Sequence, residues 1–110
     1  MENKRTFWLS YDLGIKGNYS SLYRWLDKQN AKECGDCIAY FEFICKTDNP
    51  RDEIKKDLIK NIEFHKTDRI YLIWKDETKD SNVGVFIIGN RKTAPWDGYC
   101  VTDTEQTIDM

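Results

Sequence analysis

The chain has 110 residues, of which 40% are hydrophobic and 14% aromatic, so it is long enough to fold as one domain around its own core. Its 17 basic and 19 acidic residues give a net charge of −2, which argues against nucleic-acid binding through bulk charge but allows a local basic patch. No apolar run approaches the roughly 20 residues needed to span a bilayer, so no membrane partner is expected.

The first predicted strand begins almost at the N-terminus. No secretory signal precedes it, which indicates a cytoplasmic protein with reduced cysteines. Residues 6–11 form an apolar run rich in aromatics, as expected for a central strand covered on at least one face. Asp12 stands where this strand ends, and Gly14 permits a tight connection. Asn18 is a typical N-cap, and the apolar spacing after it predicts a helix over residues 19–29.

A hairpin is predicted next. Residues 34–37, Cys-Gly-Asp-Cys, place glycine first in a two-residue loop, which suits a type II′ turn between strands over residues 31–34 and 37–45. In the longer strand, the side that carries Phe41 and Phe43 is the expected core face. A slip of one residue would expose these rings, so we expect a firm register.

A second helix and two more strands complete the pattern. Asn49 and Pro50 form a strong helix start. Strands are predicted over residues 69–75 and 83–89, with a polar loop between them. The buried stripe of the second helix is expected to contain Ile54, Leu58, Ile59 and Ile62.

The segment after the last strand is distinct in composition. Residues 93–99 read Thr-Ala-Pro-Trp-Asp-Gly-Tyr, and Trp96 and Tyr99 are aromatic anchors of the kind that dominate interfaces. We expect this segment to dock on its own domain or on a partner subunit. Residues 101–110 are predicted to be a flexible acidic tail beyond a single domain over residues 1–100.

The order of these elements predicts an α+β fold. Specifically, it predicts a ferredoxin-like βαββαβ sandwich, with two helices on one face of an antiparallel sheet, an extra C-terminal strand and a docked aromatic tail. If the turn at residues 34–37 does not form, a βαβαββ sheet with parallel pairs is the alternative.

Three short motifs carry a resemblance. Residues 10–12 (Ser-Tyr-Asp), 38–42 (Ile-Ala-Tyr-Phe-Glu) and 68–73 (Asp-Arg-Ile-Tyr-Leu-Ile) occur in this order within residues 6–89. With this succession of elements, the chain resembles the small CRISPR-associated adaptation proteins, which are dimeric ferredoxin-like subunits of the spacer-integration complex, and the related toxin-type ribonucleases.

The resemblance implies a homodimer and a nuclease. One Asp12 from each subunit would meet its symmetry mate and hold a divalent ion, Mg²⁺ or Mn²⁺, as both metal ligand and catalytic residue. RNA or DNA would then be the partner, and the last strand would cross to extend the sheet of the other subunit.

The residues alone leave alternatives open. An aspartate after a strand commonly caps the following turn, so Asp12 has a structural interpretation as well. The competing function is a non-enzymatic homodimeric module that binds a protein or another ligand through its sheet or tail. In either case, the predicted interface residues are Trp96, Tyr99, Val85 and Ile87.

Other candidate ligands have weaker patterns. Cys34 and Cys37 have the spacing of half a zinc site, but no second pair completes it, so structural thiols are favoured. Cys45 is expected to be a small buried residue. His65 has no nucleophile motif nearby and is predicted to be an exposed loop histidine.

A modest basic edge and several aromatics point to nucleic acid. The aromatics either stack bases on a sheet surface or fill the core and an interface, and the second reading is favoured because aromatics dominate core burial. The residues of the edge are Lys4, Arg5, Lys16, Arg91 and Lys92, and the aromatics are Trp8, Trp25, Tyr71 and Trp74.

Overall fold

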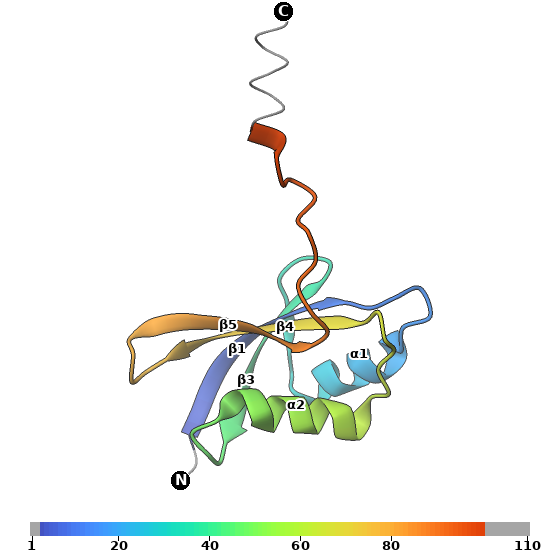
Figure 1. Cartoon of the computed structure of the whole chain (residues 1–110). Helices are drawn as coiled ribbons and strands as arrows, with labels where there is room; N and C mark the ends of the chain where they lie inside the picture. Colours follow the sequence, from blue (N-terminus) through green and yellow to red (C-terminus); the bar gives the residue numbers. More distant parts are fainter. Residues whose placement is uncertain (1–2, 101–110) are drawn as a thin grey trace, which may run out of the picture.

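A computed structural model describes residues 3–100, so the predicted tail over residues 101–110 lies outside the described residues. Across the described range, five strands form one antiparallel sheet, and two helices pack on one of its faces (Figure 1). The prediction of an α+β fold is confirmed. The elements are β1 (Asn3–Asp12), α1 (Tyr19–Lys28), β2 (Lys32–Glu33), β3 (Ile38–Cys45), α2 (Pro50–Asn61), β4 (Arg69–Asp76) and β5 (Ser81–Ile88).

The strand order in the sheet is β2-β3-β1-β4-β5, and every pair is antiparallel. The parallel alternative is therefore wrong. β1 lies in the centre, as predicted, because Phe7 is opposite Phe41 on one side and Trp74 on the other. β5 adds a fifth strand beside β4, so the order differs from that of a classic four-stranded ferredoxin-like sheet.

Period-two alternation places the core between the sheet and the helices. The ring of Phe7 stacks on Phe41 at 5.7 Å between centroids, and Trp25 from α1 meets Phe41 edge-on at 5.3 Å. The predicted core side of β3 is thus confirmed. Ile54, Leu58 and Ile62 are buried, as predicted. Ile59 was expected in the same stripe but is 52% exposed, because it follows Leu58 directly and so lies about 100° around the helix from it.

The hairpin between β2 and β3 forms, but the predicted type II′ turn is wrong. The Cys34 N–H donates to the Ile38 carbonyl at 2.9 Å, so three residues lie within the loop instead of two. The Glu33 carboxylate accepts the Gly35 N–H at 3.1 Å, and Gly35 adopts a φ of +125°. These contacts close the chain with a wider loop and leave β2 only two residues long.

Both helices start where the sequence predicts, but their caps differ. The Asn49 side chain accepts the Asp52 N–H at 3.2 Å and caps α2. Asn18 occupies the N-cap position of α1 without a side-chain hydrogen bond to the helix. Neither α1 nor α2, among the described residues, is long and apolar enough to span a membrane.

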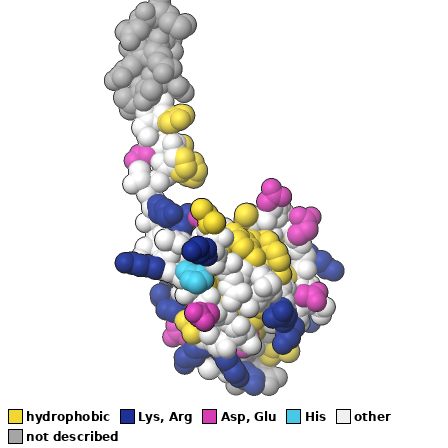
Figure 2. Space-filling model, turned by 90° about the vertical axis from the view of Figure 1, so that its right-hand side faces the viewer, with side chains coloured by type: hydrophobic (Ala, Val, Ile, Leu, Met, Phe, Trp, Pro, Cys, Tyr) yellow, Lys and Arg dark blue, Asp and Glu magenta, His cyan; other side chains and the backbone are white. Residues whose placement is uncertain are grey.

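The aromatic part of the C-terminal segment over residues 90–100 does not dock on its own domain, which corrects the prediction of a docked aromatic tail. Trp96 is 74% exposed and Tyr99 is 62% exposed. Gly89, with a φ of +75°, turns the chain out of the sheet, and Arg91 still lies over the rings of Tyr71 and Phe86 before the segment leaves the body. Figure 1 shows the segment leaving on the side of the sheet opposite the helices, and Figure 2 shows its hydrophobic side chains standing clear of the body. Docking on a partner subunit stays a prediction.

Candidate nucleic-acid interface on the open sheet face

The face of the sheet opposite α1 and α2 is not covered by either helix (Figure 1). The same alternation that buries one side of each strand sends aromatic and aliphatic side chains to this open face. Trp8, in the central strand, is 40% exposed. Large apolar side chains that are left half-exposed in the middle of a sheet commonly mark a binding surface. The apolar side chains of the open face are Trp8, Ile38, Tyr40, Ile44, Tyr71, Ile73 and Phe86.

The first ring pair on this face joins the two central strands. Trp8 lies opposite Tyr40 in the β1–β3 register, and their ring centroids are 5.5 Å apart at an interplanar angle of 48°. On its other side Trp8 is opposite Ile73 in β4. The pair is thus held by packing across three strands.

The second ring pair joins β4 and β5. Tyr71 lies opposite Phe86, with 4.8 Å between centroids and an angle of 69°. A Cβ atom on Gly84 would lie 2.9 Å from carbons of the Tyr71 ring, closer than real contacts allow. The glycine therefore lets the Tyr71 ring lie across β5, where a larger residue would push it away.

Two arginines lie over these rings. The Arg91 guanidinium is 5.6 Å from the centroid of Tyr71 and 5.3 Å from that of Phe86, and Arg69 is 5.5 Å from Phe86. Such cation–π contacts orient the guanidinium plane. Lysines farther along the sheet form exposed ion pairs, Lys4 with Glu42 and Lys75 with Asp80. Within residues 3–100, Arg91 has no carboxylate partner.

A hollow of about 280 Å³ opens beside the second ring pair. Its walls bring together three strands and the segment after β5, so they combine aromatic, cationic and acidic side chains. The lining residues are Ser10, Asp12, Arg69, Tyr71, Phe86 and Arg91.

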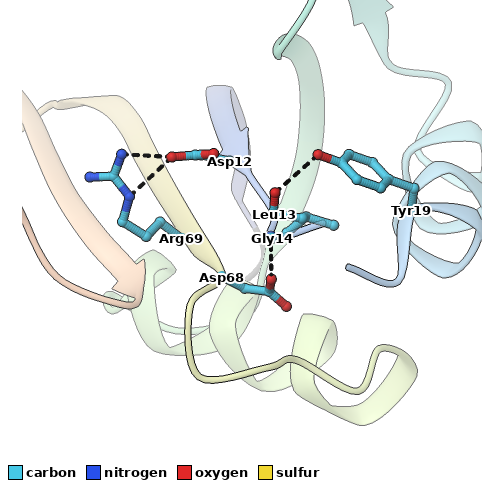
Figure 3. Close-up of polar contacts among 6 residues, drawn as sticks. All are labelled: Asp12, Leu13, Gly14, Tyr19, Asp68 and Arg69. Atoms are coloured by element: carbon cyan, nitrogen blue, oxygen red, sulfur yellow. Dashed lines mark hydrogen bonds and ion pairs between the residues drawn. The ribbon is translucent and has the colours of Figure 1, made fainter. Parts of the chain in front are cut away.

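Asp12 lies at the edge of this hollow and forms an ion pair with Arg69 (Figure 3). Arg69 donates from Nη2 to the Asp12 Oδ2 at 2.7 Å and from Nε to the same oxygen at 3.2 Å. The two residues are direct neighbours in the β1–β4 register. Within the described chain, Asp12 makes no hydrogen bond to the turn that follows it, so the turn-capping interpretation does not hold.

A divalent ion does not fit Asp12 within one protomer. The guanidinium at 2.7 Å repels a cation and already uses one carboxylate oxygen. Over residues 3–100, no group of three or more His, Cys, Asp or Glu side chains could hold a metal ion. The symmetric Asp12 pair needs a second copy of the chain and stays a prediction from the sequence.

The residue that orders the turn after β1 is Asp68, which sequence reasoning did not single out for this role. Its side chain is only 1% exposed, and it accepts the Gly14 N–H at 2.8 Å and the His65 N–H at 2.7 Å. A separate hydrogen bond also holds the turn, because the Tyr19 hydroxyl donates to the Leu13 carbonyl at 3.2 Å (Figure 3). Asp68 therefore joins the loop before α1 to the loop before β4.

A signal for Asp68 was present in the strand pattern. The buried positions of β4 are Ile70, Leu72 and Trp74, and one further step of two residues backwards reaches Asp68. A carboxylate in phase with buried side chains must find hydrogen-bond donors, since a buried charge without partners is strongly unfavourable. Here the donors are backbone N–H groups of two loops.

The other predicted site residues are spread over the molecule. Cys34 and Cys37 are free thiols and are exposed. His65 is exposed in its loop, as predicted. Cys45 is buried, as expected, and burial raises the pKa of its thiol. Trp25 and Trp74 belong to the core, which leaves Trp8 and Tyr71 as the aromatics of that group on the open face.

Some of the predicted interface residues are buried in the protomer and others are exposed. Ile87 is 2% exposed and packs in the core, so it is not a surface contact of the protomer. Val85 is partly buried against that core. Trp96 and Tyr99 remain exposed on the C-terminal segment, where a partner can reach them.

Comparison with protein-family models, curated proteins and solved structures gives no match for this chain. The resemblance to the CRISPR-associated adaptation proteins therefore stays a prediction from the sequence. The side chains of the open face and their placement are what bear on function.

Proposed function

We propose that this protein binds single-stranded nucleic acid on the open face of its sheet. The observation that carries the proposal is the presence of two cross-strand ring pairs, Trp8 with Tyr40 and Tyr71 with Phe86, on a face that neither helix covers. Unstacked bases bind to such rings in a sequence-tolerant way, with each base–aromatic stack contributing about 1–3 kcal/mol.

The strand arrangement supports the same proposal. We assign the part β2-β3-β1-β4 to the ferredoxin-like split βαββαβ arrangement and treat β5 as an addition. RNA-recognition sheets of four strands carry their base-stacking aromatics on an exposed sheet face. Trp8 in β1 and Tyr40 in β3 have comparable positions on the two central strands here. This support is an analogy at the level of the fold.

The charge of the chain predicts how the binding should respond to salt. With a net charge of −2, affinity has to come mainly from stacking and from a few cations beside the rings. For single strands, each phosphate that a cation neutralises contributes about −0.7 to the slope of log K against log salt. We therefore expect a shallow slope, on the order of −1 to −2.

The geometry supports binding and not hydrolysis. Asp12 is engaged by Arg69, and the hollow beside it holds no histidine or cysteine among its lining residues. A nuclease would require a second Asp12 from another copy of the chain. Cleavage therefore stays the alternative that the resemblance implies, and binding is the function that we propose.

The test is the affinity for labelled single-stranded RNA and DNA oligonucleotides, measured by fluorescence anisotropy. Removing one ring in Trp8→Ala or Tyr71→Ala should weaken binding roughly 5- to 150-fold, the range that corresponds to 1–3 kcal/mol. The control is Ile15→Ala, because Ile15 is fully exposed in the loop before α1 and belongs to neither ring pair.

Two results would oppose the proposal. One is wild-type protein that binds neither oligonucleotide at low salt. The other is binding that Trp8→Ala and Tyr71→Ala leave as strong as in the Ile15→Ala control. Urea unfolding of each variant separates loss of binding from loss of folding. Both rings are on the surface side of the sheet, so we expect the variants to stay folded.

A further inference from the structure

The hollow beside the second ring pair has the charge and the donors of an anion site. Among its lining residues, Arg69 and Arg91 are cationic and Asp12 is anionic, so its formal charge is one positive unit. Arg69 and Asp12 neutralise each other through their ion pair. The charge that remains for a ligand is that of Arg91.

Arg91 is held in place but keeps its hydrogen-bond donors. Its guanidinium carbon lies 5.6 Å from the ring centroid of Tyr71 and 5.3 Å from that of Phe86, and a cation–π contact does not engage the N–H groups in hydrogen bonds to oxygen. No side-chain hydrogen bond or ion pair of Arg91 occurs within residues 3–100. A planar guanidinium with a free edge suits a phosphate, which it can bind through two parallel N–H bonds.

Ser10, in β1, supplies a neutral hydrogen-bond donor to the same hollow. It lies beside Tyr71 in the β1–β4 register and lines the same hollow. Hydroxyl groups commonly share phosphate oxygens with arginine in nucleic-acid complexes. The Asp12 carboxylate would repel an anion, but the Arg69 guanidinium at 2.7 Å offsets that charge.

We propose that this hollow binds a phosphate of the nucleic-acid strand, with Arg91 as the principal ligand and Ser10 as a second donor. The inference rests on the proposed function and deepens it, because it fixes where the backbone of the strand runs. Bases stack on the Trp8–Tyr40 pair while one backbone phosphate sits at Arg91, whose guanidinium lies over Tyr71 and Phe86. An internal phosphodiester and a terminal phosphate both fit this chemistry.

Three variants test the role of Arg91 in oligonucleotide binding. Arg91→Gln should weaken binding and reduce the magnitude of the salt slope by about 0.7, the share of one phosphate contact on a single strand. Arg91→Lys keeps the charge, so the slope should stay while affinity falls because the bidentate fork is lost. The control is Lys92→Gln, which removes the same charge one residue away, where no cation–π contact within residues 3–100 orients the side chain.

Modified strands identify the phosphate. Replacing one phosphodiester at a time by a neutral methylphosphonate should weaken wild-type binding at one position, and that loss should vanish in Arg91→Gln. If instead only a strand with a 5′- or 3′-terminal phosphate binds more tightly than its unphosphorylated counterpart, and Arg91→Gln removes that difference, the ligand is a terminal phosphate. An unchanged slope and affinity in Arg91→Gln, or equal losses in Lys92→Gln, overturns the inference while leaving the proposed function in place.

If the wild-type protein binds no oligonucleotide, the proposed function fails, and inorganic phosphate alone decides the inference. In that case the side-chain Nε–H resonance of Arg91 is followed during titration with phosphate. A saturable shift that Lys92→Gln retains would support the site. The absence of a shift would overturn it.

Discussion

At the scale of single residues, Tyr11 is a titratable group that the fold perturbs strongly. It belongs to β1, and its hydroxyl donates to the Asp36 carbonyl at 2.9 Å in the loop between β2 and β3. Burial, with the neighbouring Tyr23 as the next cause, raises the pKa of Tyr11 from 10.0 to about 12. The phenol therefore stays protonated in the folded state at a pH where the unfolded chain has begun to lose the proton.

This pKa predicts a loss of stability at alkaline pH. A folded-state pKa above the ordinary value means that the folded state binds the proton more tightly. The contribution of Tyr11 to the free energy of unfolding is then fully present below pH 10 and is lost as the pH rises toward 12. Two pKa units correspond to about 2–3 kcal/mol.

Urea unfolding across this pH range measures the effect, with Tyr11→Phe as the comparison. The variant loses the hydrogen bond to Asp36 at every pH, but its stability should fall less steeply than that of the wild type. Parallel stability curves for the two proteins would contradict the expected titration of Tyr11.

The limits of sequence reasoning at this scale are visible at Asp12. Its position at the end of a strand was predictable from the apolar run before it. Its partner was not, because Arg69 is 57 residues away in the chain and becomes a neighbour only through the β1–β4 register. Asp68 was missed for a related reason: its two N–H donors come from loops, and loop backbone has no sequence periodicity.

At the scale of elements, the strands were predicted more accurately than their connections. Apolar and polar residues alternate with a period of two, which gave the buried side of β3 correctly. The turn between β2 and β3 was placed one residue wrong because the Glu33 side chain, and not the Gly-Asp pair, helps to close it. In β1 and β4 the open face was not distinguished from the core, because both sides of these two strands carry aromatic residues.

Gly84 shows how one element of the sheet shapes the proposed binding surface. In Gly84→Ala, the new methyl group would overlap the Tyr71 ring, so the ring must rotate away from β5 and from Arg91. We expect weaker oligonucleotide binding with a change in the free energy of unfolding of less than about 1 kcal/mol, since the site is on the surface side of a strand at the sheet edge.

The measurement combines anisotropy with the NMR shifts of the Tyr71 ring. Asn82→Ala is the matched control, because Asn82 is exposed in the same strand and its Cβ already exists. In a Tyr71→Ala background, Gly84→Ala should have no further effect on binding, because the ring that it displaces is gone. A loss of the same size in both backgrounds would show that Gly84 acts by another route.

At the scale of the whole molecule, the part of the C-terminal segment that follows Arg91 and carries Trp96 and Tyr99 stands apart from the body (Figure 1). Its exposed Trp96 and Tyr99 have the character of interface anchors without a surface to occupy on their own domain. The sequence could predict that these residues have the character of anchors. It could not predict what they contact, because the sequence of one chain does not identify the surface of a partner. The predicted homodimer gives them a role.

A homodimer that uses this segment should be weakened by Trp96→Ser. We expect light scattering to give a dimeric mass for the wild type and a lower average mass for the variant at the same concentration. Ile59→Ser is the control, because Ile59 is an exposed apolar residue of α2 on the other side of the sheet. A monomeric wild type, or equal masses for Trp96→Ser and wild type, would contradict this assembly.

The turn at Gly89 separates the residues of the core from the cation of the proposed phosphate site. The hydrophobic core ends with Ile88, whereas Arg91 follows the turn and reaches back over the rings of the sheet. The residues that form the core therefore come before Gly89, and the cation proposed to bind the ligand comes after it. Changes after residue 89 can alter the affinity for phosphate while the strands that present Ser10 and the rings stay the same.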